Sequence, residues 1–368
     1  YTDSLTSPSF LLEPQRTNLI TYSEDFSTWS RSANVTVSDS SELAPNGQLD
    51  AYLIEYDGNN YSYIRRSGFS ATSSTLSVFA KKGNWRYLGL RNIQVLGDDH
   101  TVFDFDTETF SNIASGQTAS FEIFSNGWYR IKVNNPSPSA GNTFIGFALT
   151  NSSGAELNPT GGQVANVHLF GAQLEDGDYA TSYIPTNGST VTRVQETCVG
   201  AGNASTFNST EGVLYAEISA LANYNLQRWL SLSDSTQSNA VKIALYNNAT
   251  DFRFAVEVRS GNLTQAFMTY DFGAVTPTMT KIAIKFKQND FALWVNGGER
   301  KTDTSGNTPT GLSELSFDRG DGVQDFEGKV KCVAVFNEAL TDDELQQLTG
   351  PEYNSFAALA AAYNYTVI

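Results

Sequence analysis

Apolar and polar residues alternate with a period of two along most of this chain of 368 residues. Turn-forming clusters, such as residues 81–84 and 134–138, separate the alternating segments, and the pair Asn296 and Gly297 predicts a tight turn. Because side chains on a strand alternate between two faces, this pattern predicts many short strands in an all-β sandwich or jelly roll. The predicted strands are residues 74–80, 87–91, 101–105, 128–133, 143–149, 212–218, 241–246, 252–258, 281–286 and 291–295.

The alternation is interrupted between residues 186 and 197, where turn-forming residues and a run of Ser and Thr occur. We therefore predict two tandem jelly-roll domains, at residues 14–195 and 197–349, with residues 1–13 as a lead-in. Residues 350–368 are expected as a C-terminal extension made of a short helix and a strand. Just before this extension, residues 341–348 predict a helix that begins with a capping box of Thr341 and Glu344.

Several motifs resemble known families. Residues 171–186 (GAQLEDGDYATSYIPT), followed by Thr192 and Arg193, resemble a segment of bacteriophage tail-fibre and adhesin-like proteins with concanavalin A-like or jelly-roll modules, as do residues 12–20, 126–130 and 340–345. The opening of the first half is similar to carbohydrate-binding modules. In the second half, residues 212–217 (GVLYAE), 292–297 (ALWVNG) and 328–336 (GKVKCVAVF) resemble a laminin G-like, concanavalin A-like lectin domain.

These resemblances imply a non-catalytic protein of the virion surface or another extracellular location. It would be a tail fibre, a receptor-binding protein or a head-decoration protein that binds host cell-surface polysaccharide. Its other partners would be virion proteins. The protein would also form homo-oligomers, commonly trimers, because attachment gains avidity from repeated weak sites. Two alternatives stay open: a structural protein that only mediates virion assembly, and a secreted polysaccharide-active enzyme or its binding module.

The composition narrows the range of partners. Hydrophobic residues make up 40% of the chain and aromatic residues 12%, enough for a core in each half, whereas charged residues are only 17%. The formal net charge of −16 disfavours binding to nucleic acid or to anionic lipid, and no apolar run approaches the roughly 20 residues that a membrane helix needs. The two cysteines, Cys198 and Cys332, are expected either as one disulfide bond or as free thiols.

Aromatic residues beside arginines are the candidate saccharide-binding residues. Aromatic faces stack on pyranose rings, and guanidinium groups donate hydrogen bonds to hydroxyl groups. The alternative is that most of these side chains belong to the core of a sandwich. The candidates are Tyr61, Tyr63, Arg65, Trp85 and Arg91 in the first half and Arg228 and Trp229 in the second.

Acidic residues give two further hypotheses. Asp104, Asp106 and Glu108 have the spacing of paired glycosidase carboxylates, but a solvated turn after the strand of residues 101–105 explains them better. No cofactor is certain. Structural calcium is the one candidate, because carboxylate and carbonyl oxygens are the ligands it prefers. Residues 18–29 resemble the opening strand of jelly-roll carbohydrate-binding modules that can hold calcium, and this resemblance implies Glu24 and Asn166 as candidate ligands in the first half. In the second half, the candidates are Asp318, Asp321 and Asp325, which cluster in a glycine-rich loop.

No familiar catalytic set is present in the sequence. The two histidines, His100 and His168, lie far apart in the chain, and neither a Gly-x-Ser-x-Gly motif nor a phosphate-binding loop occurs. We therefore expect that the protein is not an enzyme.

Overall fold

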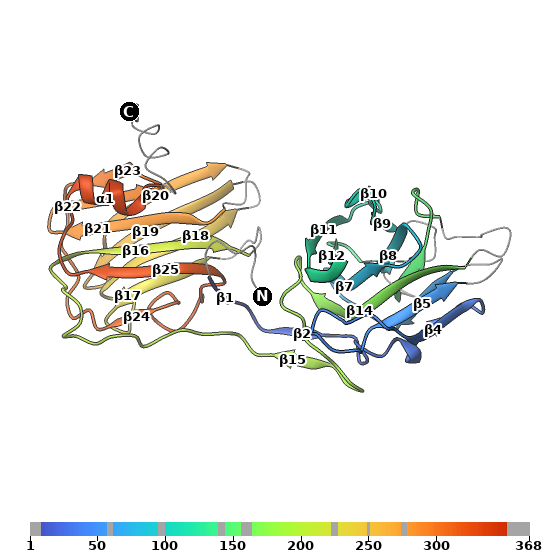
Figure 1. Ribbon diagram of the computed structural model, residues 1–368. Helices are drawn as coiled ribbons and strands as arrows, with labels where there is room; N and C mark the ends of the chain where they lie inside the picture. Colours follow the sequence, from blue (N-terminus) through green and yellow to red (C-terminus); the bar gives the residue numbers. More distant parts are fainter. Residues whose placement is uncertain are drawn as a thin grey trace, which may run out of the picture. The chain divides into compact units, whose positions relative to one another are not determined.

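The computed structural model describes residues 9–56, 62–94, 100–138, 144–155, 164–221, 227–248, 251–273 and 278–351 (Figure 1). The chain divides into two compact units. Residues 15–194 form one of them, named here the inserted unit. Residues 1–14 and 195–368 together form the other, the split unit.

Two six-stranded antiparallel sheets form the inserted unit. Sheet 1 has the order β10 (Thr109–Asn112), β9 (Thr101–Asp104), β8 (Tyr87–Gln94), β13 (Phe144–Leu149), β6 (Tyr63–Ser67) and β3 (Ser30–Arg31). Sheet 2 has the order β11 (Thr118–Ile123), β12 (Trp128–Asn135), β7 (Ser74–Lys82), β14 (Ala165–Asp176), β5 (Tyr52–Tyr56) and β4 (Val35–Asp39). Every second residue is apolar and faces the other sheet, so that Leu90 and Phe147 share one core with Val78 and Leu169.

Residues 171–186 close the inserted unit. Gly171 has a φ of +57°, and a Cβ atom there would lie 2.9 Å from the Tyr183 ring, so only glycine fits. Beyond it, the side-chain carbonyl of Gln173 accepts a hydrogen bond of 2.6 Å from the backbone N–H of Ile184. The amide of Asn18 donates to the carbonyl oxygens of Ala172 and Ile184 at 3.2 and 2.9 Å. The motif is therefore a buried network that ties both ends of the unit together.

The two ends of the inserted unit also pair directly. β2 (Arg16–Asn18) and β15 (Val191–Arg193) form a two-stranded antiparallel sheet in which Arg16 is opposite Arg193. The chain therefore enters and leaves this unit through adjacent strands.

The split unit is a second sandwich. Sheet 3 has the order β1 (Phe10–Leu12), β25 (Gly328–Phe336), β16 (Glu211–Ala220), β21 (Thr280–Lys287), β22 (Asp290–Val295) and β23 (Gly298–Asp303). Sheet 4 has the order β20 (Leu263–Gly273), β19 (Asp251–Ser260), β18 (Ala240–Asn248), β17 (Arg228–Ser233) and β24 (Glu314–Ser316). Their facing side chains, such as Leu214 and Ile284 of sheet 3 with Leu230 and Val256 of sheet 4, form its core.

The first strand of the split unit comes from the segment that we expected as a lead-in. β1 pairs with β25 in antiparallel register, and Leu12 is buried in the core with 6% of its surface exposed. The ring of Phe10 contacts Phe317 edge to face at 5.7 Å. The split unit is therefore assembled from two segments separated by 180 residues of the inserted unit.

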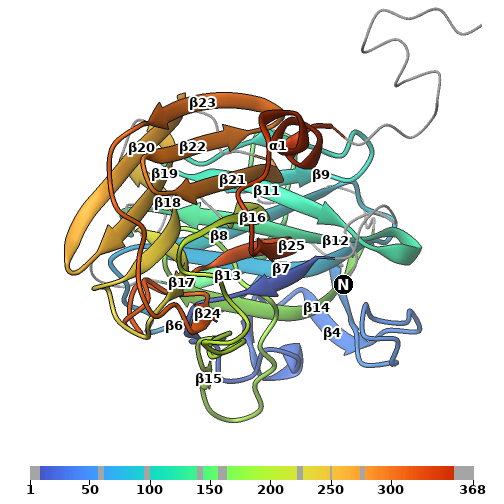
Figure 2. The same ribbon diagram turned by 90° about the vertical axis from the view of Figure 1, so that its left-hand side faces the viewer.

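Helix α1 (Asp342–Thr349) covers the outer side of sheet 3, where it packs against β21, β22 and β23 (Figure 2). Its buried Leu345 joins Tyr215 and Trp294 in a small apolar cluster. The predicted capping box is confirmed, because the hydroxyl of Thr341 accepts from the N–H of Glu344 and the Glu344 carboxylate accepts from the N–H of Thr341.

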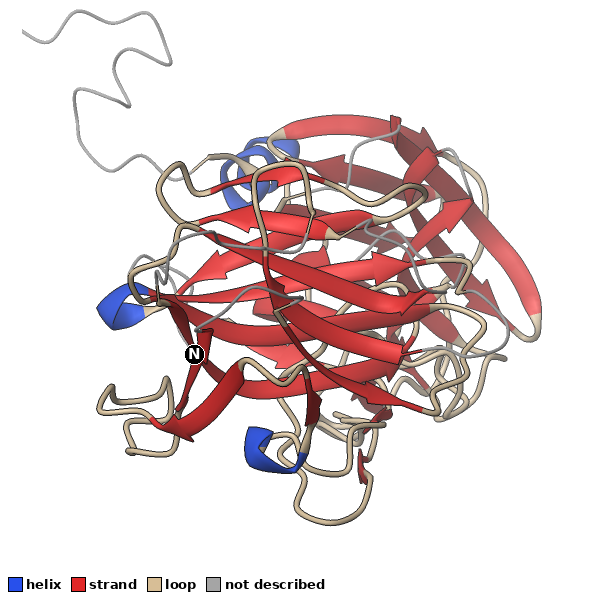
Figure 3. Ribbon diagram, turned by 90° about the vertical axis from the view of Figure 1, so that its right-hand side faces the viewer, coloured by secondary structure: helices blue, strands red, loops and turns tan. Residues whose placement is uncertain are grey.

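Strands dominate both units (Figure 3), and the predicted all-β class with jelly-roll sandwiches and one C-terminal helix is confirmed. The predicted strands are present, and Asn296 and Gly297 form the turn between β22 and β23 with φ values of 49° and 78°. Cys198 and Cys332 are free and exposed. The expected helix and strand of the C-terminal extension lie outside the described residues. In the described part, no helix is long and apolar enough to cross a membrane.

Candidate functional site

The outer face of sheet 1 carries the most informative group of side chains. On β6, β13 and β8, the residues Ile64, Phe147 and Leu90 face the core, so their strand neighbours face outward. In the register of these strands, Gly146 of β13 lies between Arg65 of β6 and Arg91 of β8. Two arginines therefore flank a glycine on the exposed side of the sheet.

Aromatic rings hold both guanidinium groups. The guanidinium carbon of Arg65 lies 4.6 Å from the centroid of the Tyr63 ring and 5.0 Å from that of Phe144. The guanidinium of Arg91 lies over the same Phe144 ring at 5.0 Å. Phe144 and Arg91 are 8% and 5% exposed, whereas Tyr63 and Arg65 are half-buried. These four residues are named here the arginine–aromatic patch.

Small residues on β13 let the neighbouring strand β6 approach closely beside the patch. A Cβ atom on Gly146 would lie 2.7 Å from the carbonyl oxygen of Ile64 and 3.1 Å from the Cβ of Arg65. The next outward residue of β13 is Ala148, which pairs with Tyr63. A larger side chain at Gly146 would displace β6 or the Arg65 side chain, so the geometry of the patch depends on this glycine.

Arg65 differs from its neighbours in its bonding. Among the described residues, the side chain of Arg65 makes no hydrogen bond and no ion pair, and contacts only the two rings. The adjacent Arg66 donates to the hydroxyl groups of Thr21 and Thr28, and Arg86 donates two hydrogen bonds to Asp104. The donors of Arg65 are thus oriented by the rings but not used within the described part of the chain.

The sequence candidates of the first half have different positions. The structure brings Tyr63, Arg65 and Arg91 together. Trp85 lies elsewhere, because it packs against the core and its indole N–H donates to the carbonyl oxygen of Thr150 at 2.9 Å. Tyr61 lies outside the described residues. Phe144, which links the two arginines, was not among the candidates.

The candidates of the second half are both buried. Arg228 is 1% exposed, and its guanidinium lies 3.6 Å from the carboxylate of Glu327. Trp229 is 5% exposed, and the ammonium of Lys242, which pairs with Glu257 at 2.7 Å, lies 4.9 Å from its ring centroid. Neither residue presents an open surface for a sugar ring.

The three carboxylates at residues 104–108 each have a protein partner, and Arg86 contacts two of them, Asp104 at 2.7 Å and Asp106 at 3.5 Å. Arg86 holds Asp104, Lys82 pairs with Asp106, and the hydroxyl of Tyr129 donates to Glu108 at 2.8 Å. The hydrogen bonds from Arg86 lower the pKa of Asp104 to about 2. A glycosidase needs a carboxyl group with a raised pKa as its acid, and the lowered pKa of Asp104 is the opposite of that requirement. The predicted turn between β9 and β10 is confirmed.

The first pair of calcium candidates is not brought together by the contacts of the structure. Glu24 accepts a hydrogen bond from Tyr183 at 3.3 Å, and burial raises the pKa of Glu24. Asn166 instead closes the turn between β7 and β8, where its side chain accepts from the N–H of Asn84 at 2.8 Å.

The second group of calcium candidates also has protein partners. Asp318 accepts from the N–H of Gly320, Asp321 pairs with Arg319 at 2.8 Å, and Asp325 accepts from Gln195 at 2.8 Å. Within the described residues, no group of three or more Asp, Glu, His or Cys side chains is placed to hold a metal ion. Structural calcium stays a prediction.

The two histidines are each held by one nearby oxygen. In His100, the Nδ1 atom lies 2.9 Å from the carbonyl oxygen of Gly154, and in His168 it lies 2.8 Å from the hydroxyl of Ser40. Burial lowers the pKa of His168. These contacts give both rings a structural role.

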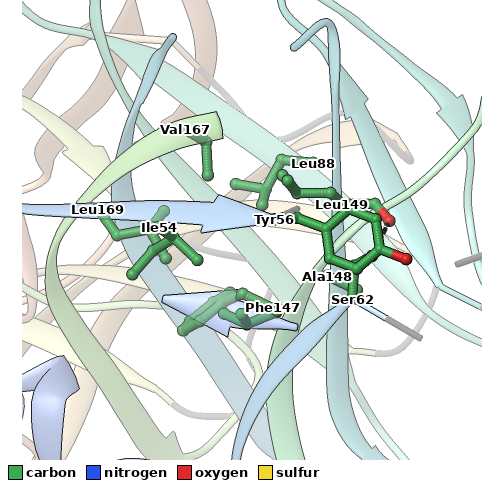
Figure 4. A pocket seen from close by; sticks show the side chains of 10 residues that line it. Ile54, Tyr56, Ser62, Leu88, Phe147, Ala148, Leu149, Val167 and Leu169 are labelled. Atoms are coloured by element: carbon green, nitrogen blue, oxygen red, sulfur yellow. Dashed lines mark hydrogen bonds between the residues drawn. The ribbon is translucent and has the colours of Figure 1, made fainter. Parts of the chain in front are cut away.

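A pocket between the two sheets of the inserted unit is too small for a ligand. Ile54 and Leu169 of sheet 2 face Leu88 and Phe147 of sheet 1 around it (Figure 4). Its volume is about 10 Å³, which is close to the minimum that one water molecule requires. We interpret it as a packing gap in the core.

Comparison with known proteins gives only distant structural similarity. No protein family and no curated protein matches the chain. The carbohydrate-binding module CBM40 of the Ruminococcus gnavus IT-sialidase is similar at 20% identity, over 43% of this chain and 98% of the module, with a TM-score of 0.33. Domains LG4–5 of the mouse laminin alpha1 chain are similar at 10% identity, over 77% of this chain and 90% of theirs, with a TM-score of 0.25. The SAP-like pentraxin of Limulus polyphemus is similar at 11% identity, over 39% of this chain and 70% of its own, with a TM-score of 0.31. At these values the similarities do not assign a function.

Proposed function

We propose that this protein is a non-catalytic glycan-binding protein, and that it binds saccharide with the arginine–aromatic patch of the inserted unit. The observation that supports this is the convergence of Tyr63, Arg65 and Arg91 on Phe144 at the outer face of one sheet. A half-exposed tyrosine ring offers a surface for the C–H face of a pyranose. The guanidinium of Arg65 offers up to five N–H donors for its oxygen atoms.

The position of the patch on regular strands favours recognition. Sites on strands hold their side chains more firmly than sites on loops, and the rings restrict the rotamers of both arginines. Binding to such a site loses less conformational entropy than binding to a mobile loop. The patch is small, so we expect one site to bind weakly and several copies to bind together through avidity.

We further propose that the chain belongs to the surface of a bacteriophage particle, as a tail-fibre, receptor-binding or head-decoration protein that acts as a homo-oligomer. This part rests on the resemblance of residues 12–20 and 171–186 to phage tail-fibre proteins. Asn18 and residues 171–186 form the closing network of the inserted unit, whereas Leu12 lies in the core of the split unit, so these segments support a shared architecture and do not name a ligand.

The test is binding of the full-length protein to a panel of bacterial surface polysaccharides and their oligosaccharides. We expect at least one to bind, and Tyr63→Ala to weaken that binding by about tenfold, because a stacked aromatic contact contributes roughly 1 kcal/mol or more. Arg31→Gln is a control that removes the same charge from a neighbouring strand. Arg31 is exposed on the edge strand β3, its guanidinium donates to the carbonyl oxygen of Ser27, and it is not part of the patch.

The same panel separates the alternatives. If no saccharide binds while the protein associates with purified phage particles, the protein is an assembly component. Release of reducing ends from a polysaccharide, abolished by Asp106→Asn, would instead identify an enzyme. Immunogold labelling of particles from the phage that carries the gene tests the virion assignment directly, and unlabelled particles would exclude it.

A further inference from the structure

We propose that the arginine–aromatic patch selects saccharides that carry a carboxylate, and that this carboxylate binds the guanidinium of Arg65. The inference rests on the proposed function and names the class of sugar: an acidic sugar such as a uronic acid.

The first reason is the state of Arg65 in an acidic chain. The protein has 39 acidic residues and 23 Lys and Arg residues. In the described part of the inserted unit, Lys81, Lys82, Arg86 and Lys132 each pair with a carboxylate. Arg65 is half-exposed and contacts only two aromatic rings among the described residues. In a chain with this excess of carboxylates, a guanidinium held away from all of them is available for an external anion.

The second reason is the geometry around Gly146. Arg65 and Arg91 lie on the strands to either side of this glycine, so their Cα atoms are about 10 Å apart across two strand spacings. Both guanidinium groups lie 5.0 Å from the Phe144 ring, on which they converge. The Phe144 ring therefore holds the Arg65 guanidinium in one orientation, so that its donors are pre-organised for an anion.

The third reason is the match of chemistry. A guanidinium presents parallel N–H donors that fit a planar carboxylate with two hydrogen bonds. Such charge-assisted bonds are roughly twice as strong as those to a neutral hydroxyl group. A carboxylated sugar would therefore use both the charge of Arg65 and the partly exposed ring of Tyr63, whereas a neutral sugar would use only the ring and weaker hydrogen bonds.

A polyanionic surface is a poorer match. Binding to nucleic acid or to an anionic membrane draws on many cations spread over a surface. The patch offers one such cation, Arg65, because Arg91 has a further partner of its own, and the chain has a net charge of −16. One carboxylate of a saccharide fits this number, because the repulsion from the rest of the protein is screened beyond about 10 Å at moderate salt.

The experiment compares acidic and neutral saccharides on the full-length protein. Each acidic saccharide that binds in the panel is also measured after chemical reduction of its carboxylates to primary alcohols, by titration calorimetry at constant ionic strength. We expect reduction to weaken binding by about tenfold to a hundredfold, since hydrogen bonds to charged groups contribute more than neutral ones. Arg65→Gln should remove most of that difference, Arg65→Lys should keep part of it, and Arg31→Gln should leave it unchanged.

Each outcome decides one of the two proposals. Binding of neutral saccharides only, or equal binding before and after reduction, overturns the preference for a carboxylate and leaves glycan binding intact. Binding of saccharides that requires a phosphate group and not a carboxylate overturns the preference for a carboxylate in the same way. A panel without any hit removes the proposed function and this inference together. Thermal unfolding of Arg65→Gln and Arg65→Lys shows whether both variants are folded. If Arg65→Gln is unfolded, Arg65→Lys alone tests the preference for a carboxylate, because lysine keeps the charge but loses the planar pair of donors.

Discussion

Replacing Leu12 with Ala is expected to destabilise the split unit and to leave the inserted unit unchanged. Leu12 belongs to β1, which is followed directly by the inserted unit in the chain, yet its side chain is 6% exposed in the core of the split unit. Leu11 is the matched control. It is the adjacent residue of the same strand, pairs with Lys329, and is only half-buried.

The size of the effect follows from the burial. Truncation of a buried leucine to alanine costs roughly 2–5 kcal/mol, from lost transfer energy and from the cavity that remains. β1 is an edge strand of three residues, so its surroundings relax more easily than a central strand would. We therefore expect about 2–3 kcal/mol for Leu12→Ala and less than about 1 kcal/mol for Leu11→Ala, whose side chain buries less apolar surface.

Hydrogen exchange with mass spectrometry on the full-length protein measures the loss of stability separately in each of the two units. A loss of about 2–3 kcal/mol corresponds to exchange that is roughly 30 to 150 times faster in β25 and β16 when they open with the split unit. Peptides from β7 and β14 should keep their wild-type protection. Equal effects of the two substitutions, or faster exchange in the inserted unit, would refute the assignment of β1 to the core of the split unit.

Three further substitutions test other parts of the structure. Gly171→Ala should destabilise the inserted unit by about 1–3 kcal/mol in urea unfolding, because it adds a methyl group against the Tyr183 ring at a positive φ; an unchanged midpoint would contradict the close contact. The folded pKa of Asp104, about 2, lies below its usual 3.8 because of Arg86, so its stabilising contribution is present above about pH 4 and is lost as the pH falls through about 2. Thermal unfolding of wild type and Asp104→Asn should therefore differ most above pH 4 and converge towards pH 2, and a constant difference would count against the pairing. Thr341→Ala should cost about 1 kcal/mol by removing the N-cap of α1, measured as faster hydrogen exchange in residues 342–349, and unchanged exchange there would show that the cap contributes little.

The strands that were predicted, such as β7, β19 and β22, each have an alternating pattern of five residues or more. β1 could not be assigned in the same way. Its three residues are too few for a period, and its partner β25 lies more than 300 residues further along the chain. Local pattern reveals a strand, but it carries no information on which distant sheet completes its hydrogen bonds.

The candidate site was predictable in part. Tyr63, Arg65 and Arg91 were candidates because the sequence places aromatic residues beside arginines, and the structure brings these three together. The role of Phe144 depends on the register between β13 and its two neighbours, and register is a property of the pair of strands. One signal was available: an isolated glycine within a strand, here Gly146, often marks a close approach.

Trp85 and Trp229 were candidates for saccharide binding, with a place in the core of the sandwich as the alternative. Trp85 follows a turn-forming cluster and Trp229 follows an arginine, and neither pattern distinguishes the two alternatives. In the structure the indole of Trp85 bonds to Thr150, and an ion-paired lysine covers the ring of Trp229. Tertiary contacts of this kind come from residues that are distant in the chain, so local composition does not reveal them.

The pairing of Arg16 with Arg193 means that the inserted unit starts and finishes at one point. A domain whose ends meet can be exchanged for another without stretching the polypeptide that receives it. Recombination at residues 14 and 195 would thus replace the unit that carries the proposed saccharide site in a single genetic event. The receiving sandwich would retain its own core throughout, so specificity and scaffold could evolve separately.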